Sequence, residues 1–243
     1  MNETLEIILR TETVYDDAGK AYRLHSHTRK EQGLFLQNII RKIKPEKSIE
    51  VGLAYGISTL FICEALRENK IGHHYVMDPY QRQWHNIGLK NIHDAGYDDI
   101  VDFYEEPADR LLSNFFLKNV KIDFAYLDGS KVFDVVFFNI YILSKIMNVG
   151  GVLVLDDCTF PGIKKVVRFL NVHPCFEYYS GFKPIYDSPK RRLAKTIFRI
   201  LPVRPLIKEE FLFPLNGQNL DFHCIAFKKV KEDTRPWNWY CEF

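Results

Sequence analysis

The sequence predicts an α/β fold built on a doubly wound, mostly parallel sheet. Apolar runs alternate with amphipathic stretches over residues 48–173, and these runs are short and mostly continuous. Continuous runs are typical of strands buried on both faces, and strand–helix alternation favours parallel pairing. The chain of 243 residues is long enough for one large core, and its 47% hydrophobic and 26% charged residues are typical of globular proteins. We therefore expect a single domain over residues 1–243.

Each element is expected from its own signals. Residues 1–45 are expected to be a helical segment, because apolar residues recur at helical spacing after Thr28, a candidate N-cap, and Pro45 ends the pattern. Strands are expected over 48–53, 73–78, 100–106, 122–128 and 151–157, and helices over 56–69, 83–97, 108–116, 132–151 and 161–173. The stretch 132–151 is too long for a strand and ends at a glycine pair, which favours a helix.

The regular alternation ends before the last quarter of the chain. Residues 175–182 and 221–230 are expected to form two further strands, which could pair as an antiparallel edge. Between them lies a basic insertion, 183–219, which is longer than a connection between neighbouring strands requires. Residues 181–210 hold eight Lys or Arg against three acids, and 189–201 has the pattern of an amphipathic helix.

Composition argues against several classes of protein. No apolar run approaches the roughly 20 residues of a membrane span, and the N-terminus lacks the pattern of a signal peptide, so we expect no integral membrane segment. The formal charge of +2 indicates no class of partner, and no basic groove with interleaved aromatic residues suggests nucleic-acid binding. Five scattered cysteines without a CxxC pair indicate reduced thiols, and therefore a cytoplasmic protein without a zinc site or a disulfide frame.

Acidic residues stand at the carboxyl ends of four expected strands. They are Glu50 in the first strand, Asp78 in the second, Asp128 in the fourth, and Asp156 with Asp157 in the fifth. In an open α/β sheet, ligands bind beyond these ends. Charge at such a place must be desolvated or given a ligand. The pattern therefore predicts a ligand site at this edge of the sheet.

The loop after the first strand, EVGLAYGIST, has the features of a nucleotide-binding turn. Gly52 and Gly56 bracket a tight turn where the backbone can approach a ligand, and Ser58 and Thr59 offer hydroxyl groups at the following helix N-terminus. Asp78 lies 22 residues after Gly56, close to the spacing at which a second-strand acid binds ribose hydroxyls. Dinucleotide binding is a rival interpretation, although its fingerprint is G-x-G-x-x-G and this loop is Gly-x-x-x-Gly.

Two sets of motifs resemble a known family. SIEVGLAYGISTLFICEAL with HHYVMD resembles the first two motifs of class I S-adenosylmethionine-dependent methyltransferases. YLDGSKVFD and NVGGVLVLDDCTFPGIKKVV resemble the metal-dependent O-methyltransferase branch, which includes catechol, caffeoyl-CoA, and bacterial sugar and antibiotic O-methyltransferases. The resemblance covers about residues 25–175. It implies a Rossmann-like, seven-stranded sheet and methyl transfer from S-adenosylmethionine to a hydroxyl of a sugar, phenol or natural product, assisted by a divalent metal such as Mg²⁺.

The resemblance also implies roles for individual residues. The residues that would line the cofactor are Glu50, Gly52, Tyr55, Gly56 and Ser58 at its methionine part, Asp78 at the ribose, and Pro107 and Ala108 near the adenine, with Asp128 beside them. Asp128, Asp156 and Asp157 would be the metal ligands, and Lys131 falls where catechol-type members place a catalytic lysine. Asp157 stands where those members often have Asn, and many bacterial relatives have His at the position of Lys131.

A bound cation gives these acids a physical role. Three carboxylates at neighbouring strand ends would repel one another unless a divalent cation lay among them, and such oxygen ligands suit Mg²⁺ or Ca²⁺. A cation would lower the pKa of a bound substrate hydroxyl and favour the neutral form of Lys131, as a general base requires. The structural alternatives are a salt bridge from Lys131 to Asp128 or Asp134, and a helix-capping role for Asp156 and Asp157.

Other readings stay open. The alternatives to the O-methyltransferase are a metal-independent N- or C-methyltransferase, a dinucleotide-dependent oxidoreductase and a non-catalytic nucleotide-binding module. His25, His27, His73 and His74 are expected to be structural or solvated. The aromatic C-terminus, 237–243, is expected to pack against the sheet edge, to form a subunit contact, as in a homodimer, or to contact the substrate. The basic insertion 183–219 is expected to be a solvated surface helix, a lid beside the small-molecule acceptor, or a membrane-surface element.

Overall fold

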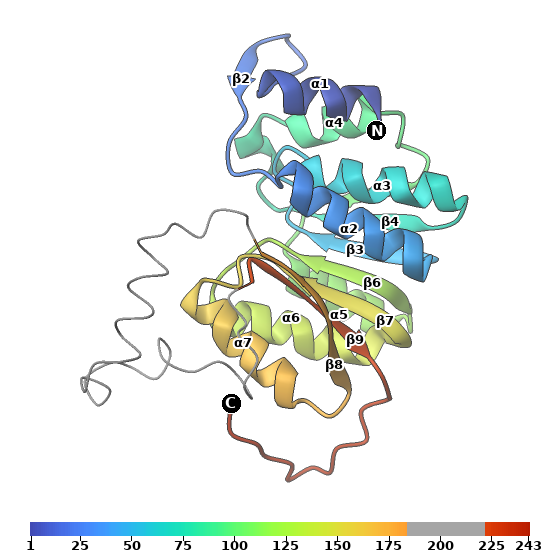
Figure 1. The fold of residues 1–243 in the computed structure, drawn as a ribbon, viewed down its shortest axis with the longest axis vertical. Coiled ribbons are helices and arrows are strands. Elements are labelled where there is room, and N and C mark those ends of the chain that lie inside the picture. The colour runs from blue at the N-terminus through green and yellow to red at the C-terminus, as the bar shows by residue number, and fades with distance from the viewer. Residues whose placement is uncertain (184–221) are drawn as a thin grey trace, which may run out of the picture.

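The computed structural model describes residues 1–183 and 222–243, and these form a seven-stranded sheet with helices on both faces (Figure 1). The strands are β3 (Lys47–Val51), β4 (His73–Met77), β5 (Val101–Tyr104), β6 (Ile122–Leu127), β7 (Met147–Leu155), β8 (Phe176–Phe182) and β9 (Cys224–Lys229). Their order in the sheet is β5-β4-β3-β6-β7-β9-β8. Neighbours from β5 to β7 are parallel, and β9 is antiparallel to both of its neighbours. The predicted mostly parallel sheet with an antiparallel edge is confirmed.

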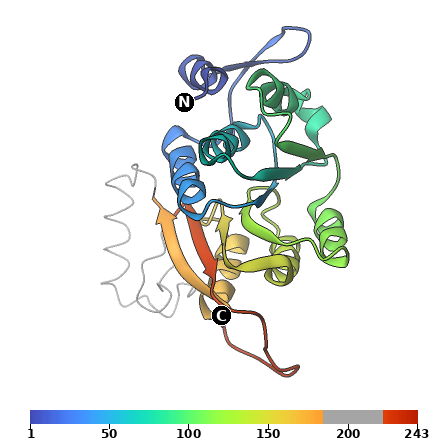
Figure 2. The ribbon, with the colours of Figure 1, turned by 90° about the vertical axis from the view of Figure 1, so that its right-hand side faces the viewer.

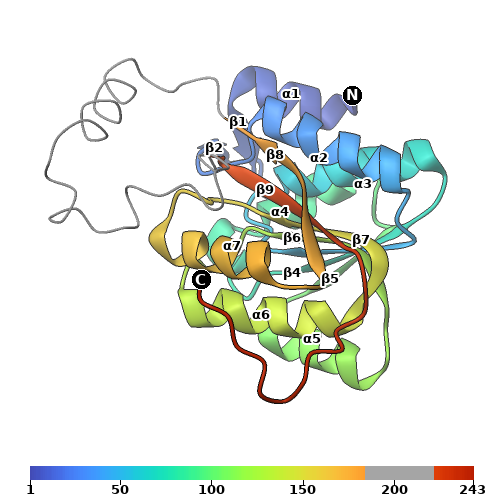
Figure 3. The same ribbon diagram turned by 60° about the horizontal axis from the view of Figure 1, so that its bottom comes forward.

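Helices cover both faces of the sheet, as Figure 3 shows. The helices are α1 (Glu3–Thr11), α2 (Lys30–Ile43), α3 (Ile57–Asn69), α4 (Ile87–Asp94), α5 (Ala108–Leu117), α6 (Phe133–Ile146) and α7 (Pro161–Val172). Apolar residues of α5, α6 and α7 share one core cluster with Ala125 and Leu153, whereas those of α2 and α3 cluster with Phe124 and Val154 on the opposite face. Because strand side chains alternate between faces, both sets must be apolar, which explains the continuous apolar runs of the sequence.

The order of the strands creates a switch point between β3 and β6. From β3 the chain proceeds outward to β4 and β5, and it then returns to β6 on the other side of β3. In doubly wound sheets the connections diverge at such a point and leave a crevice at the carboxyl ends of the strands. Figures 1 and 2 show α1 at the end of the molecule that carries β4 and β5, and the C-terminus at the end that carries β8 and β9.

The N-terminal segment is only partly helical, in contrast to the prediction. A hairpin of β1 (Thr13–Tyr15) and β2 (Ala21–Arg23) separates α1 from α2, and its three-residue strands are too short to give a recognisable pattern. The predicted N-cap is also wrong. Arg29 is the N-cap of α2 and makes no side-chain capping bond. Thr28 is instead buried beside the ligand cavity.

Two helix boundaries differ from the predictions. The helix expected over 83–97 is divided into a 3₁₀ turn, η1 (Gln81–Trp84), and α4, because His85 and Asn86 adopt left-handed φ values of 55° and 56°. The helix expected over 132–151 ends at Ile146, and β7 begins at the next residue. The glycine pair at its expected end therefore lies inside a strand, next to a register shift between β6 and β7 that glycine accommodates.

The antiparallel edge agrees with the expected strands. β8 and β9 lie within residues 175–182 and 221–230, and the two strands pair with each other. The predicted basic insertion, with its amphipathic helix, lies outside the described residues except for Lys183. None of the helices in the described ranges is long and apolar enough to cross a membrane.

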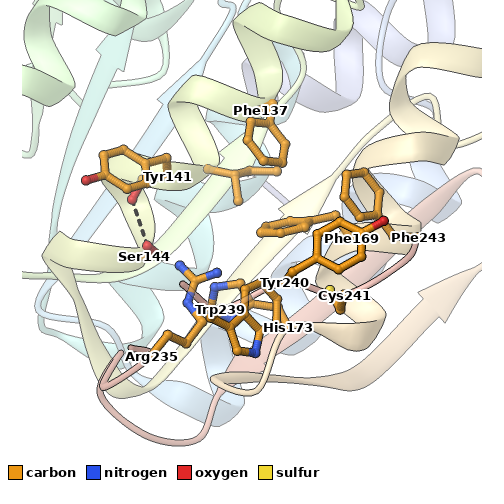
Figure 4. Close-up of a pocket in the computed structure, with 11 residues that line it drawn as sticks. Phe137, Tyr141, Ser144, Phe169, His173, Arg235, Trp239, Tyr240, Cys241 and Phe243 are labelled. Carbon is orange, nitrogen blue, oxygen red and sulfur yellow. Dashed lines mark hydrogen bonds between the residues drawn. The ribbon is translucent and has the colours of Figure 1, made fainter. Parts of the chain in front are cut away.

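The aromatic C-terminus packs on helices rather than on the sheet edge. Figure 4 shows its rings over α6 and α7, where they enclose a cavity of about 300 Å³. The ring of Phe243 lies 5.3 Å from that of Phe169, and the guanidinium of Arg235 lies 4.6 Å from the ring of Trp239. Trp237, at 97% exposure, does not take part. The intrachain packing therefore involves α6 and α7, and the predicted subunit contact stays a prediction.

Candidate functional site

A cavity of about 610 Å³ opens at the carboxyl ends of β3, β4, β5, β6 and β7. Its lining residues follow the strand ends: 51–55 after β3, 77–80 after β4, 107–109 after β5, 128–131 after β6, and Asp157 after β7. This volume is typical of sites for small molecules and cofactors. The acids at the strand ends predicted a ligand site at this edge, and the switch point between β3 and β6 is where the crevice lies.

Most of the predicted cofactor residues meet in this cavity. Those among its lining are Gly52, Tyr55, Ser58, Asp78, Pro107, Ala108 and Asp128, together with Lys131 and Asp157 from the predicted catalytic and metal sets. Glu50, Gly56 and Asp156 lie behind the lining. The convergence is not a trivial consequence of sequence proximity, because five separate strand ends contribute to it.

Gly52 allows the loops after β3 and β6 to approach each other closely. It adopts φ 96°, and a Cβ atom there would lie 3.1 Å from the carbonyl carbon and oxygen of Asp128. Backbone hydrogen bonds hold the strand ends together beyond the sheet itself: Asp128 N donates to Val51 O at 2.9 Å, and Gly52 N donates to Met77 O at 2.9 Å. A residue without a side chain is therefore required at position 52 for the cavity to have this shape.

Asp78 holds the glycine loop in place. Its Oδ2 accepts hydrogen bonds from the backbone N–H groups of Leu53 and Ala54, both at 3.0 Å, and its Oδ1 accepts one from Tyr80 N at 2.8 Å. The residue is only 5% exposed. The carboxylate predicted to bind ribose thus also fixes the backbone of the loop that would surround the cofactor.

Glu50 belongs to the inner structure of the site, not to its wall. The side chain is fully buried, and it accepts hydrogen bonds from the hydroxyls of Ser58 and Thr59. His74 Nε2 lies 3.0 Å from Glu50 Oε2, and His74 Nδ1 lies 2.8 Å from Ser48 Oγ. The predicted contact of Glu50 with the cofactor is therefore not what the geometry provides, because α3 covers its carboxylate. The structural role expected for His74 agrees with this network.

An aromatic wall and the N-terminal segment close one side of the cavity. Tyr55 packs edge-on against Trp84 with ring centroids 4.9 Å apart, and its hydroxyl lies 2.9 Å from His25 Nε2. His27 and Thr28 complete this side of the lining. His25 and His27 were expected to be structural or solvated; His25 positions Tyr55, and His27 lines the cavity. Burial lowers the pKa of His27, which favours its neutral form.

Lys131 lies between two of the predicted metal ligands. Its Nζ is 2.8 Å from Asp128 Oδ1 and 3.1 Å from Asp157 Oδ2. Burial disfavours the ammonium, but the attraction of Asp128, their hydrogen bond, and the charges of Asp157 and Asp156 outweigh it and raise the pKa of Lys131 above its ordinary value. Without a cation, Lys131 is therefore charged, which is opposite to the neutral form expected of a base beside a metal. The salt bridge to Asp128 considered from the sequence is present.

Asp156 lies under the cavity in a buried polar network. Its Oδ2 accepts hydrogen bonds from Gln32 Nε2 and from the hydroxyl of Tyr126, both at 2.9 Å. Burial and the charge of Asp156 raise the pKa of Asp128 well above its ordinary value. The opposite holds for Asp156 itself: burial is outweighed by the hydrogen bond from Cys224 and by the charges of His223 and Lys131, which lower its pKa. Asp156 is thus the more strongly ionised of the two carboxyls.

The structure gathers a different set of possible metal ligands from the one predicted. Ligand atoms of Asp156, Asp157 and His223 lie within 4.8 Å of one another. Asp128 is not in this set, and its carboxylate pairs with Lys131 instead. His223 precedes β9, more than sixty residues after the aspartates, so no sequence motif connected it to them.

Asn139 is a second residue that the sequence analysis missed. It lies on α6, lines the cavity and is 3% exposed, and its Oδ1 has no hydrogen-bond partner among the described residues. A buried polar atom without a partner is costly, so such an atom beside a cavity indicates a ligand that satisfies it. In the sequence Asn139 is one polar residue within an apolar helical stretch, and no local motif marks it as a site residue.

Comparison with known proteins agrees with this geometry. Residues 49–158 match the family model described as a methyltransferase domain. The tapetum-specific methyltransferase 1 of Arabidopsis thaliana is 29% identical over 136 residues, which are 54% of this chain and 55% of that protein. The caffeoyl-CoA O-methyltransferase 2 of Zea mays is 29% identical over 155 residues, covering 58% of this chain and 56% of that protein. The chain thus spans little more than half the length of these relatives.

Solved structures share the fold over a longer range. An O-methyltransferase from Bacillus cereus in complex with SAH has a TM-score of 0.65 at 16% identity, covering 95% of this chain and 92% of that one. The O-methyltransferase TomG from Streptomyces achromogenes has a TM-score of 0.55 at 15% identity, covering 74% and 82%. At these identities the likeness shows the fold. The predicted resemblance to class I methyltransferases of the O-methyltransferase branch is confirmed by the family match over residues 49–158 and by the curated relatives, which include caffeoyl-CoA O-methyltransferases.

Proposed function

We propose that this protein transfers a methyl group from S-adenosylmethionine to a hydroxyl oxygen of a small molecule, with assistance from a divalent metal. One observation carries the proposal. Residues predicted separately for the cofactor, the metal and the proton transfer line a single cavity at the switch point of the sheet. The printed names of the relatives, which include caffeoyl-CoA O-methyltransferases, support the same reaction.

The cavity fits the cofactor by its polar groups as well as by its volume. The Gly52 loop leaves backbone exposed to the cavity, Asp78 lies at the second strand end, and Pro107 and Ala108 line a third side. The unpartnered Oδ1 of Asn139 offers an acceptor to the edge of a ring, such as the amino group of adenine. A solved structure of similar fold was obtained with SAH, and another with SAM.

The acidic cluster fits a divalent cation by the chemistry of its donors. The carboxylates of Asp156 and Asp157 and the imidazole of His223 lie close together, and Asp156 is buried. Carboxylates and imidazoles are ligands of divalent metals in proteins. A bound cation would supply charge that stabilises a deprotonated acceptor hydroxyl. Asp156 and Asp157 would hold it, and Gln32 and Tyr126 fix the orientation of Asp156 by hydrogen bonds.

The proton of the acceptor hydroxyl needs a base at the cavity. S-adenosylmethionine, when bound, supplies an electrophilic methyl on sulfur, and the S–C bond electrons return to sulfur as the C–O bond forms. Asp128 lies in the lining, and burial with the charge of Asp156 raises its pKa, whereas the pKa of Asp156 is lowered, so Asp128 is the stronger proton acceptor of the two. Lys131, charged and 2.8 Å from Asp128, positions this carboxylate and stabilises negative charge on the acceptor oxygen.

The finer properties of the reaction are part of the proposal. The acceptor is a sugar, a phenol or a natural-product hydroxyl, and the relatives make a phenol the first class to test. We infer a cytoplasmic location, since all five cysteines are free thiols. A homodimer is compatible with the exposed rings of Trp237 and Tyr240.

Isothermal titration calorimetry of the full chain tests the proposal. S-adenosylmethionine and S-adenosylhomocysteine are expected to bind in the micromolar range, whereas NAD is expected not to bind. Chelation with EDTA should abolish methyl transfer to a catechol or caffeoyl acceptor and leave cofactor affinity unchanged within about threefold. Tight NAD binding without either sulfur compound would establish the dinucleotide alternative, and full activity in EDTA would leave the acids a structural role.

A further inference from the structure

A second cavity, of about 300 Å³, lies between the aromatic C-terminus and helices α6 and α7 (Figure 4). It shares no lining residue with the cavity at the strand ends, which is called the catalytic cavity below. The two cavities use different residues of α6: Asn139 lines the catalytic cavity, whereas Ile140 and Ser144 line the second. Its volume is at the lower end of the range for small-molecule sites, so a compound with one ring fits it.

Aromatic rings form most of the wall of this second cavity. The ring of Phe169 lies 4.7 Å from that of Phe137, 5.3 Å from that of Phe243 and 6.5 Å from that of Trp239, and all three pairs meet edge-on. Aromatic rings prefer such edge-to-face contacts, because the edge of a ring is electropositive and its face is electronegative. The wall therefore favours a flat aromatic ligand.

His173 offers an unused hydrogen-bond donor to this cavity. The residue lines the cavity and is only 3% exposed. Its Nδ1 accepts from Cys175 N at 3.2 Å, and burial with the charge of Arg235 lowers its pKa to about 4, so the neutral ring carries its proton on Nε2. Within residues 1–183 and 222–243, Nε2 has no hydrogen-bond partner. A buried donor without a partner is costly, which indicates a ligand with an acceptor.

The charges beside His173 leave an excess of one positive charge. Asp233 binds two cations, Arg235 Nε at 2.7 Å and Lys145 Nζ at 2.7 Å. The next cation, Lys229, has a partner of its own in Glu232. Asp233 takes up two of the five N–H groups of Arg235, whose guanidinium lies over Trp239 in the lining (Figure 4). A ligand with a single negative charge would balance this group.

We propose that this cavity is a second binding site, for an aromatic carboxylate with a single ring. The ring packs among the side chains of Phe137, Phe169 and Trp239, and the carboxylate accepts from His173 Nε2 and faces the guanidinium of Arg235. Hydrogen bonds to a carboxylate are stronger than those between neutral groups, so the buried imidazole gains most from this kind of acceptor. The inference does not depend on the proposed function, because no residue of the catalytic cavity takes part in it.

The reactivity of Cys241 tests the proposal on the full-length protein. Cys241 lines the second cavity, and the other four cysteines are buried. Iodoacetamide should therefore modify one thiol of the native protein, at a rate that mass spectrometry measures. Saturating 4-fluorobenzoate is expected to slow this reaction at least about fivefold. The amide 4-fluorobenzamide has the same shape without the charge, and at the same concentration it should slow the reaction less than about twofold.

Three variants locate the bound 4-fluorobenzoate, whose affinity is measured by ¹⁹F NMR titration. His173→Phe keeps a flat ring but removes the N–H group, and it should weaken binding at least about tenfold. His93→Phe is the matched control, because His93 pairs with Asp98 on the surface at 2.8 Å, and it should bind as wild type does. Lys131→Ala, which alters the catalytic cavity, should also leave the affinity unchanged.

Three results would overturn the proposal. Loss of binding in Lys131→Ala, with binding kept in His173→Phe, would place 4-fluorobenzoate in the catalytic cavity. Equal protection of Cys241 by the benzamide would show that the carboxylate is not recognised. An alkylation rate of wild type that 4-fluorobenzoate does not change would show that the second cavity stays empty, and this measurement needs no variant to fold.

Discussion

Asp78→Ala is expected to destabilise the whole protein as well as to weaken cofactor binding. The substitution removes the acceptor of three backbone N–H groups, from Leu53, Ala54 and Tyr80, at 2.8–3.0 Å. A hydrogen bond to a charged group contributes about 1.5–3 kcal/mol, and the lower value applies here because two of the donors are near the cavity and can reach water. The expected loss is therefore about 3–5 kcal/mol of unfolding free energy, a large part of the 5–15 kcal/mol of an ordinary domain.

Two further variants separate the carboxylate's charge from its other effects. Asp78→Asn keeps one oxygen, which can still accept from Leu53 and Ala54, but it presents an NH₂ group to the N–H of Tyr80. About half of the destabilisation should therefore remain. Asp109→Ala is the matched control, since Asp109 is another acid of the lining and the described residues give it no hydrogen bond. Its effect on stability should stay below about 1 kcal/mol.

Urea unfolding followed by circular dichroism measures the stability, and calorimetry measures S-adenosylmethionine affinity. At roughly 2–4 °C per kcal/mol for a chain of this size, Asp78→Ala should lower the melting temperature by on the order of 10 °C. A loss of cofactor affinity in Asp78→Ala with stability within 1 kcal/mol of wild type would refute the reasoning. Asp78 would then act on the ligand alone, and its bonds to the loop would contribute nothing net.

Three other outcomes follow from the structure. Gly52→Ala should lower the free energy of unfolding by about 1–2 kcal/mol, because position 52 has a positive φ. It should also weaken S-adenosylmethionine binding at least tenfold, because the new Cβ would lie 3.1 Å from the Asp128 backbone. Unchanged affinity in calorimetry would exclude such an effect on the cavity. Asn139→Leu should leave stability equal or higher but reduce cofactor affinity about tenfold, and equal affinity would show that the amide does not reach the ligand. Burial, then the charge of Arg235, lowers the pKa of His173 from 6.5 to about 4. His173 is therefore neutral in the folded protein, whereas the unfolded chain binds a proton at this residue below pH 6.5. The free energy of unfolding should therefore fall by at most about 3 kcal/mol as the pH is lowered from 6.5 toward 4. Urea titrations of His173→Gln should lack that dependence.

The fold was predictable because its signals are local. Each signal lies within fewer than ten residues: a short apolar run, the glycine loop after β3, or an acid at the end of a strand. The carboxyl ends of parallel strands must then meet at one edge of the sheet. Seven of the nine residues named for the cofactor line one cavity for this reason: Gly52, Tyr55, Ser58, Asp78, Pro107, Ala108 and Asp128. The predicted helix boundaries at 83–97 and 132–151 are wrong because the backbone changes conformation inside a stretch whose sequence pattern is continuous. Positive φ at His85 and Asn86 breaks the first, and strand pairing overrides the glycine signal in the second.

The missed residues have no local signal, since their roles depend on distant contacts. Trp84 lines the cavity because the 3₁₀ turn places its ring against that of Tyr55. Asn139 is a single polar residue in an otherwise apolar helical stretch. His223 lies in the segment that becomes the antiparallel edge, and only the insertion of β9 between β7 and β8 brings it to the strand-end acids. A sequence pattern can show that a position is buried, but it cannot show which residue from another element faces it.

The acids themselves show how partners, and not positions, decide function. Glu50, Asp78, Asp128 and Asp156 all occupy comparable strand-end positions, yet each has a different task because each has different neighbours. Hydroxyls of α3 and His74 surround Glu50, so its charge serves the interior. The carboxylate of Asp78 accepts hydrogen bonds from backbone N–H groups, and that of Asp128 forms an ion pair with the ammonium of Lys131. Asp156 Oδ1 accepts from Cys224 Sγ and from Asp157 N, and its Oδ2 accepts from Gln32 and Tyr126. The free energy needed to bury these four acids is thus offset in four different ways, by hydroxyls, by backbone N–H groups, by an ammonium and by a buried polar network.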